Sequence, residues 1–156
     1  MSQTGIRGFY LLTETIEAQL LSDVNVNTVT TGDIYDIDLA KQSIFPLSHI
    51  IINNVIAEES VLRFNISVLS MDVVDESKKE TTDIFRGNND EQDILNTQLG
   101  VLNKLVMVLR KGDLYSSQYA LDGDANCEPF YDRFENKVAG WTATMDVLVA
   151  NDITIC

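Results

Sequence analysis

The sequence predicts an α+β fold: a mainly antiparallel β-sheet with a long hairpin, packed on one face by an N-terminal helix and a long central helix. Two segments, 8–23 and Asp90–Lys111, have apolar residues at helical spacing. Two long runs rich in β-branched residues, 48–56 and 61–74, are separated by a short polar break. Helices and strands are partly segregated along the chain, which favours α+β over alternating βαβ units.

The first helix is expected over residues 8–23. Phe9, Leu12, Ile16 and Leu20 recur at intervals of three and four residues, so they share one face of a helix. Glutamate and glutamine residues lie elsewhere around the cylinder.

Two segments follow this helix. Residues 24–33 (VNVNTVTTGD) are rich in β-branched side chains and end in a Gly-Asp turn signal, so we expect a short strand. Residues 34–42 (IYDIDLAKQ) alternate less clearly, and an extended edge and an irregular loop both stay open for them.

The next two strands are expected to form a long hairpin. Residues 48–56 and 61–74 are its strands, and residues 57–60 (AEES) are a polar break of hairpin length. Pro46 has no backbone N–H, so it marks the entry to the first strand rather than its middle.

The second strand of the hairpin breaks its own pattern. Leu62, Phe64, Ile66 and Val68 share one face, and the apolar set then continues one residue out of step from Leu69. A period of two cannot shift in this way on a regular strand with one buried face. We therefore expect a bulge or a sharp bend near Val68–Leu69.

A polar, charged segment, residues 75–89 (DESKKETTDIFRGNN), leads to the long helix. Connections of this length are often functional, and Ile84 and Phe85 are apolar residues within it. We expect a loop or arm at about 75–89 on a single domain that spans residues 1–156.

The clearest helix is Asp90–Lys111. Asn89 or Asp90 can cap its start, and Gly112 is a suitable residue just past its end. Its broad apolar stripe predicts packing against a sheet, and is made up of Ile94, Leu95, Leu99, Leu102, Leu105, Val106 and Leu109.

The last third of the chain is expected to be β-structure. Residues 114–121 and 130–134 read as short strands around the turn-rich stretch DGDANCEP. Residues 138–149 alternate from Trp141 onward, which predicts a strand with one buried face.

Charge and composition exclude several classes of protein. The chain has 24 acidic and 11 basic residues and a net charge of −13. Specific binding to a duplex needs cations that neutralise phosphates, so we expect no such binding and no attraction to anionic membranes. No apolar run is long enough for a transmembrane helix, and the N-terminus does not read as a secretory signal. Cys127 and Cys156 fit free thiols, although a bridge between them stays open.

Catalytic patterns are missing from the sequence. His49 is the only histidine and sits in an apolar strand, where the interpretation is a packing residue bonded to backbone. Asp122, Asp124 and Asn126 begin like a calcium-binding loop, but Cys127 replaces the glycine that such a loop needs. We expect no enzyme, no cofactor, and no catalytic or metal-binding residues.

The order of segments resembles a known family. The helix GFYLLTETIEAQLLSDV is followed by VNTVTTGD, and then by the hairpin IFPLSHIIINNV and VLRFNISVLSMDVVD. A charged loop leads to NDEQDILNTQLGVLNKLVMVLRKG, and the closing strand reads GWTATMDVLVAND. This order resembles the tail terminator, tail-completion and neck-ring proteins of tailed bacteriophages.

The resemblance implies a structural virion protein, made in the cytoplasm of the host bacterium. Six or twelve copies would form a ring at the head-tail junction or at the end of the tail tube. DNA would pass through without specific binding, and neighbouring proteins of the neck or tail tube would be its partners. The resemblance does not imply a role for any particular residue of this chain. From the sequence itself, the candidate interface residues are Lys78, Lys79, Ile84, Phe85, Arg86, Pro46 and His49. The alternative is a small ligand- or protein-binding domain with a pocket under the long helix, where His49 or Tyr119 would supply polar groups.

Overall fold

The structure is a computed structural model that describes residues 8–33, 44–73, 90–111, 119–133 and 138–150 of the chain. Two helices and five strands follow one another in these segments. In chain order they are α1 (Gly8–Leu21), β1 (Thr28–Thr31), β2 (Leu47–Ala57), β3 (Val61–Val73), α2 (Asp90–Lys111), β4 (Tyr119–Arg133) and β5 (Val138–Ala150).

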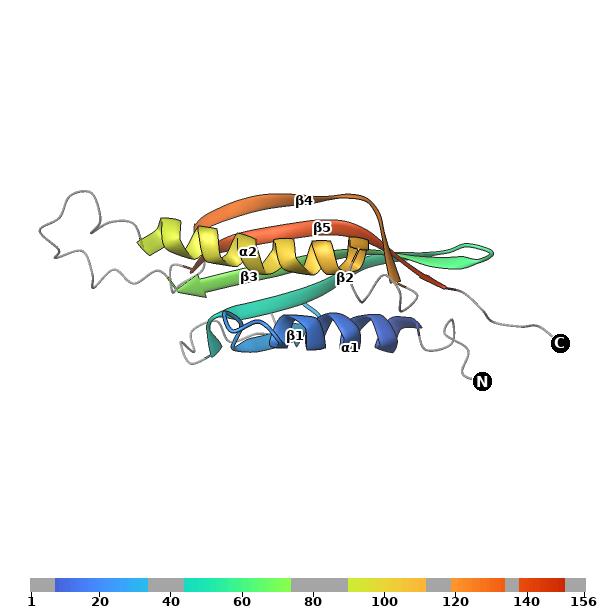
Figure 1. The fold of residues 1–156 in the computed structure, drawn as a ribbon, viewed down its shortest axis with the longest axis horizontal. Helices are drawn as coiled ribbons and strands as arrows, with labels where there is room; N and C mark the ends of the chain where they lie inside the picture. Colours follow the sequence, from blue (N-terminus) through green and yellow to red (C-terminus); the bar gives the residue numbers. More distant parts are fainter. Residues whose placement is uncertain (1–7, 34–43, 74–89, 112–118, 134–137, 151–156) are drawn as a thin grey trace, which may run out of the picture.

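The five strands form one sheet in the order β1-β2-β3-β5-β4. β1 runs parallel to β2, and every other neighbouring pair is antiparallel. The α+β prediction of a mainly antiparallel sheet with a long hairpin is therefore confirmed. The hairpin of β2 and β3 extends beyond the rest of the sheet at one end of the molecule (Figure 1).

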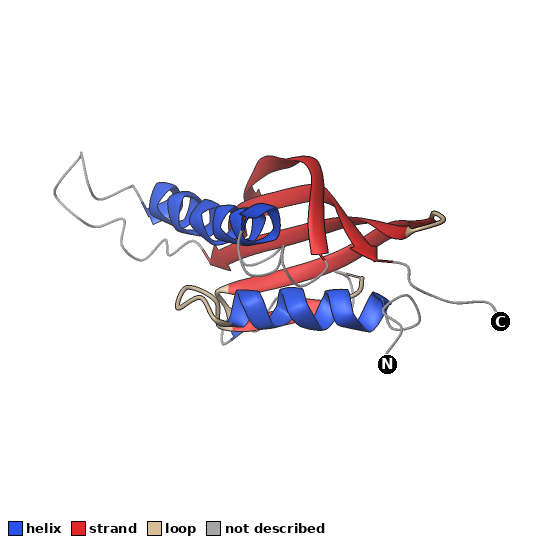
Figure 2. Cartoon of the chain, turned by 45° about the vertical axis from the view of Figure 1, so that its right-hand side comes forward, coloured by secondary structure: helices blue, strands red, loops and turns tan. Residues whose placement is uncertain are grey.

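Both helices lie on the same side of the sheet, as predicted (Figure 2). They share one apolar core with side chains from alternate residues of β2, β3 and β5. Its buried members from the helices include Leu12, Ile16 and Leu20 of α1, and Leu102, Leu105 and Leu109 of α2; the sheet contributes Phe64, Ile66, Val68, Ala143, Met145 and Val147, among others.

Polar contacts also attach α2 to the sheet. The indole N–H of Trp141 donates to the carbonyl oxygen of Leu95 at 2.8 Å. The hydroxyl of Ser70 donates to the amide oxygen of Gln98, and both side chains are buried. A buried polar group needs such a partner, so these bonds fix where α2 rests along β3 and β5.

The bulge predicted near Val68–Leu69 is wrong. Pairing between β3 and β5 is unbroken from Val61 to Val73, and β2 pairs regularly with this part of β3. The apolar side chains change face because both faces of the sheet are buried at this end. Leu69 and Met71 belong to a second cluster, on the face away from the helices, with Phe45, Leu47, Phe130 and Val138.

The irregularity of the hairpin lies in the other strand. The register between β2 and β3 shifts between Ile52 and Asn54, so that Asn53 is the extra residue. Its side-chain amide donates to Asn65 and to Ser67, both at 2.9 Å. This bulge comes where β2 changes from a buried strand to an exposed one.

The region predicted as two short strands around a loop is one strand, β4. Its register with β5 shifts between Asp122 and Asn126, where Gly123 has a φ of 73°. A glycine adopts this conformation without the strain that a side chain would add. The turn-forming residues therefore make a bulge within a strand and do not end it.

Gly140 of β5 allows a close approach that no other residue could make. A Cβ at this position would lie 2.1 Å from the carbonyl oxygen of Ser70 and 2.8 Å from the Cα of Met71.

We predict that Gly140→Ala lowers the free energy of unfolding by about 3 kcal/mol, because the backbone of the central strands must shift. Gly100→Ala in α2 is the control, since a Cβ there meets nothing within 4 Å; it should raise stability by about 0.5–1 kcal/mol. Urea unfolding of both variants checks this, and equal effects would contradict it.

Candidate functional site

The residues that the sequence suggested for an interface fall into two groups. Lys78, Lys79, Ile84, Phe85 and Arg86 lie outside the described residues. Pro46 and His49 are described, and they lie just before β2 and within it. The prediction for the first group therefore stays a prediction.

Pro46 is a half-buried anchor between two segments. Its carbonyl oxygen accepts the backbone N–H groups of Asn27, at 2.9 Å, and of Thr28, at 3.2 Å. These bonds hold the start of β1 against the start of β2.

His49 is fully buried and both of its ring nitrogens are bonded. Nε2 donates to the carbonyl oxygen of Gly32 at 2.7 Å, because a carbonyl can only accept. Nδ1 then accepts the hydroxyl of Thr30 at 2.7 Å. Burial lowers the pKa of the imidazole, while the bond to Gly32 and the charge of Asp33 act in the opposite direction. This neutral ring holds the end of β1 on β2.

Two acidic residues of β4, Asp122 and Asp124, form ion pairs. Asp122 binds Arg63, and Asp124 binds Arg110 at 3.2 Å. Within the described residues, no three histidine, cysteine or acidic side chains gather in a way that could hold a metal ion. Neither described helix is long and apolar enough to cross a membrane.

The feature of this fold that most resembles a binding surface is an open strand edge. β1 has only four residues and pairs with Leu47–Ile50, the first part of β2. Its pairing ends at Gly32, which has a φ of 116° and donates its N–H to the carbonyl oxygen of Ile50. Beyond this point, no described strand pairs with the outer side of residues 51–57. We call this segment the open edge of β2.

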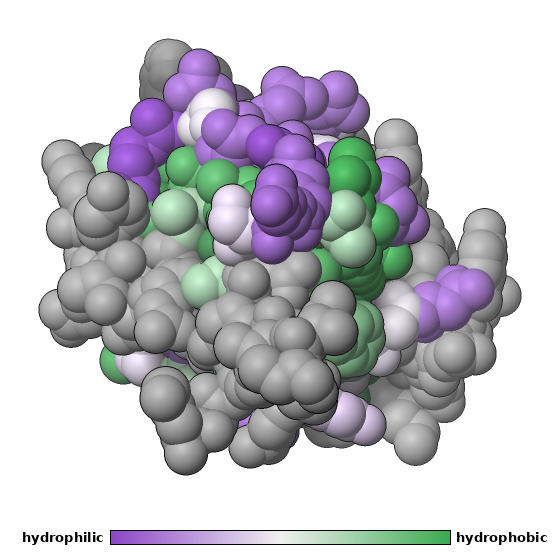
Figure 3. Space-filling model, turned by 90° about the vertical axis from the view of Figure 1, so that its right-hand side faces the viewer, coloured by the Kyte–Doolittle hydropathy of each residue, from purple (hydrophilic) through white to green (hydrophobic). Residues whose placement is uncertain are grey.

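Large apolar side chains are exposed around the open edge. Val55 and Ile56 of β2 are 43% and 52% exposed, and Phe9 and Tyr10 of α1 are 48% and 63% exposed. The start of α1 lies on the hairpin, since a Cβ at Gly8 would be 2.9 Å from Leu62 Cδ1. Figure 3 faces this end of the molecule and shows hydrophobic surface among hydrophilic residues.

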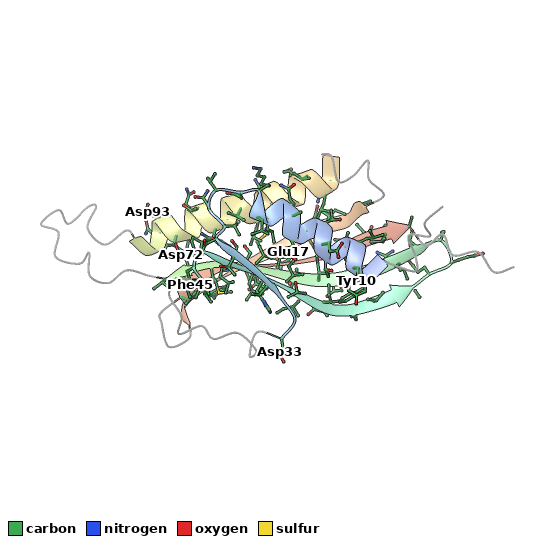
Figure 4. All side chains as sticks on the ribbon, turned by 90° about the horizontal axis from the view of Figure 1, so that it is seen from below. Tyr10, Glu17, Asp33, Phe45, Asp72 and Asp93 are labelled. Carbon is green, nitrogen blue, oxygen red and sulfur yellow. The ribbon has the colours of Figure 1, made fainter. Side chains whose placement is uncertain are left out.

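A groove of about 590 Å³ lies where β1 ends and the open edge begins. Its lining comes from α1, from β2 and from the end of β1, namely Phe9, Thr31, Gly32, Asp33, Ile51 and Ile52. Asp33 lies just past the end of β1, as Figure 4 shows. The groove continues the line of β1 along β2.

A second groove, of about 760 Å³, lies between α2 and the bulge of β4. Leu99, Met107 and Cys127 contribute apolar surface, and Arg110 crosses it to the carbonyl oxygen of Gly123 at 2.8 Å. His49 does not line it, and the side chain of Tyr119 lies outside the description. Burial raises the pKa of the Cys127 thiol.

No family model matches the chain, and no curated protein is similar to it at the threshold of the search.

The role of His49 in holding β1 leads to a prediction on pH. The unfolded chain binds a proton near pH 6.5 and the folded chain only at lower pH, so stability must fall as pH decreases below about 6.5. His49→Gln cannot titrate and should lose this part of the pH dependence. Urea unfolding of both proteins between about pH 7 and pH 5 measures the difference. The acidic residues contribute the same pH dependence in both proteins. The prediction would therefore be contradicted if the free energy of unfolding changed with pH equally in the wild type and in His49→Gln.

Proposed function

We propose that this protein is a structural subunit of a bacteriophage virion. Copies of it form a ring of six or twelve subunits at the head-tail junction or at the end of the tail tube. The proposal starts from the resemblance of segment order, and the described helices and strands follow that same order. The protein carries out no catalysis in this role, needs no cofactor, and contacts neighbouring proteins of the neck or tail.

The observation that carries the proposal is the exposed apolar end of the molecule. Tyr10, Val55 and Ile56 are exposed there beside an open strand edge. Exposed apolar surface at a strand edge is typical of contact with another protein. A ring also needs two different surfaces on each subunit, and the exposed apolar side chains of this end form one of them.

The polar part of the second sheet face suits a surface past which DNA moves. Asn65 donates to Asp146 at 2.8 Å, and the hydroxyls of Ser67 and Thr144 are 3.3 Å apart. The cation described on this face, Arg63, contacts Asp122 and Glu58. Such a face offers phosphate little attraction, in accord with a net charge of −13.

The ring itself is the first test. We expect native mass spectrometry and negative-stain microscopy to detect closed rings of the purified protein, or rings in assembled particles. Ile56→Asp should abolish them, because it puts a charge into an apolar contact. Val24→Asp is the matched control, since Val24 is 96% exposed beyond the other end of α1. A wild-type protein that is monomeric and never joins virions would refute the proposal.

The segment 75–89 gives a second test of assembly. We predict that deleting residues 78–87 leaves folding intact, because the sequence there is polar and charged and is expected to be a loop. The deletion should block ring formation or incorporation into particles. Circular dichroism and urea unfolding monitor the fold, and particle yield monitors assembly. Unchanged particles would remove this segment from the interface.

The groove between α2 and β4 favours a second candidate function, a small ligand-binding domain. A small molecule with an apolar body would suit the apolar part of its lining. If this is the function, Met107→Trp should fill the groove and cancel ligand-induced increases in melting temperature. A ligand that stabilises the variant as much as the wild type would count against it.

A further inference from the structure

The open edge of β2 presents backbone groups that no described strand uses. The N–H of Gly32 reaches the carbonyl oxygen of Ile50, so Ile50 directs its backbone groups toward β1. Alternate residues of a strand point their backbone groups to the same side, and Ile52 therefore faces the same edge. β1 ends before it can pair there. A second strand placed in line with β1 would extend the sheet along β2.

The groove beside this edge would receive a side chain of that added strand. Thr31 and Gly32 line it at the end of β1, Phe9 lines it from α1, and Ile52 lines it from β2. Its volume, about 590 Å³, exceeds what one apolar side chain fills. Strand addition takes its affinity from backbone hydrogen bonds and its specificity from such side-chain sites.

Acidic groups stand at both ends of the open edge. Asp33 lines the groove at one end, and Glu59 lies in the turn of the hairpin at the other, next to Glu58, which contacts Arg63. Of the side chains that the structure describes, no cation lines the groove. The negative charge of these side chains, together with a net charge of −13 for the chain, attracts a basic segment and repels an acidic one.

We propose that the open edge of β2 binds an extended basic segment of a partner protein as an added β-strand. The bound segment alternates apolar residues toward the groove with polar residues, and carries lysine or arginine near its ends. The occupant is a partner protein and not a second copy of this chain, whose net charge is −13. Contacts between copies in a ring use exposed apolar side chains and not the backbone groups of this edge. The site belongs to the isolated subunit and does not depend on ring formation.

Synthetic peptides test the proposal directly. The probe is a fluorescein-labelled peptide of alternating valine and threonine with paired lysines at each end, and binding is followed by anisotropy at low ionic strength. We expect binding that saturates. A peptide with glutamates in place of the lysines should bind at least about tenfold more weakly, because its charge matches that of the edge. A peptide with N-methylated backbone should lose binding as strongly, since N-methyl groups cannot donate the hydrogen bonds of a strand.

Two variants of the protein locate the site. Phe9→Ala should weaken binding of the lysine peptide by about tenfold, because an aromatic anchor covers the groove. Tyr10→Ala is the matched control: it is the next residue, more exposed and outside the groove lining, and should change binding by less than about twofold. Urea unfolding verifies that both variants stay folded.

Several outcomes of these binding experiments would overturn the proposal. Lack of saturation, equal binding of the N-methylated peptide, or equal loss in both variants would overturn the proposal. Stronger binding of a peptide that copies residues 75–89 would assign the edge to a second copy of the chain and overturn it as well. A failure in these experiments leaves ring formation untouched, because rings are measured without peptide.

Discussion

The unbroken pairing of β3 with β5 is the constraint on which the rest of the structure depends. All 13 residues of β3 pair with β5, so every side chain of β3 keeps a fixed face. Leu62, Phe64, Ile66 and Val68 face the helices, whereas Leu69 and Met71 face the opposite side. One end of the sheet is consequently buried on both faces. The other end, with the hairpin, is covered by helices on one face alone, and its second face is polar.

This division separates the parts of the molecule that close the fold from the parts that can bind. At the closed end, side-chain bonds such as those of Trp141 and Ser70 attach α2, and Pro46 and His49 hold β1 on β2. At the hairpin end no described strand pairs with the outer side of β2, which carries exposed apolar side chains there. An exposed apolar edge invites aggregation unless a partner covers it. In both proposals, the ring and the added strand, another protein contacts this end of the molecule.

Much of the fold could be predicted from the sequence, because it depends on local periodicity. Both helices and the strands of the hairpin end within two residues of their predicted bounds. The predicted bulge failed because a pattern shift has two causes, an extra residue or a change of buried face, and only cross-strand register separates them. β4 was missed as one strand because Gly123 lets turn-forming residues bulge within it. The open edge could not be predicted at all, since it depends on strand order and on how early β1 ends.

Amide hydrogen exchange along β2, measured by NMR on the isolated protein, tests the central claim most directly. The account predicts slow exchange for the amide of Ile50, which lies between β1 and β3. It predicts fast exchange for the amide of Ile52, which faces the open edge, and slower exchange once the lysine peptide is added. If the amide of Ile52 in the free protein were as protected as that of Ile50, the edge would already be occupied. That result would contradict the account.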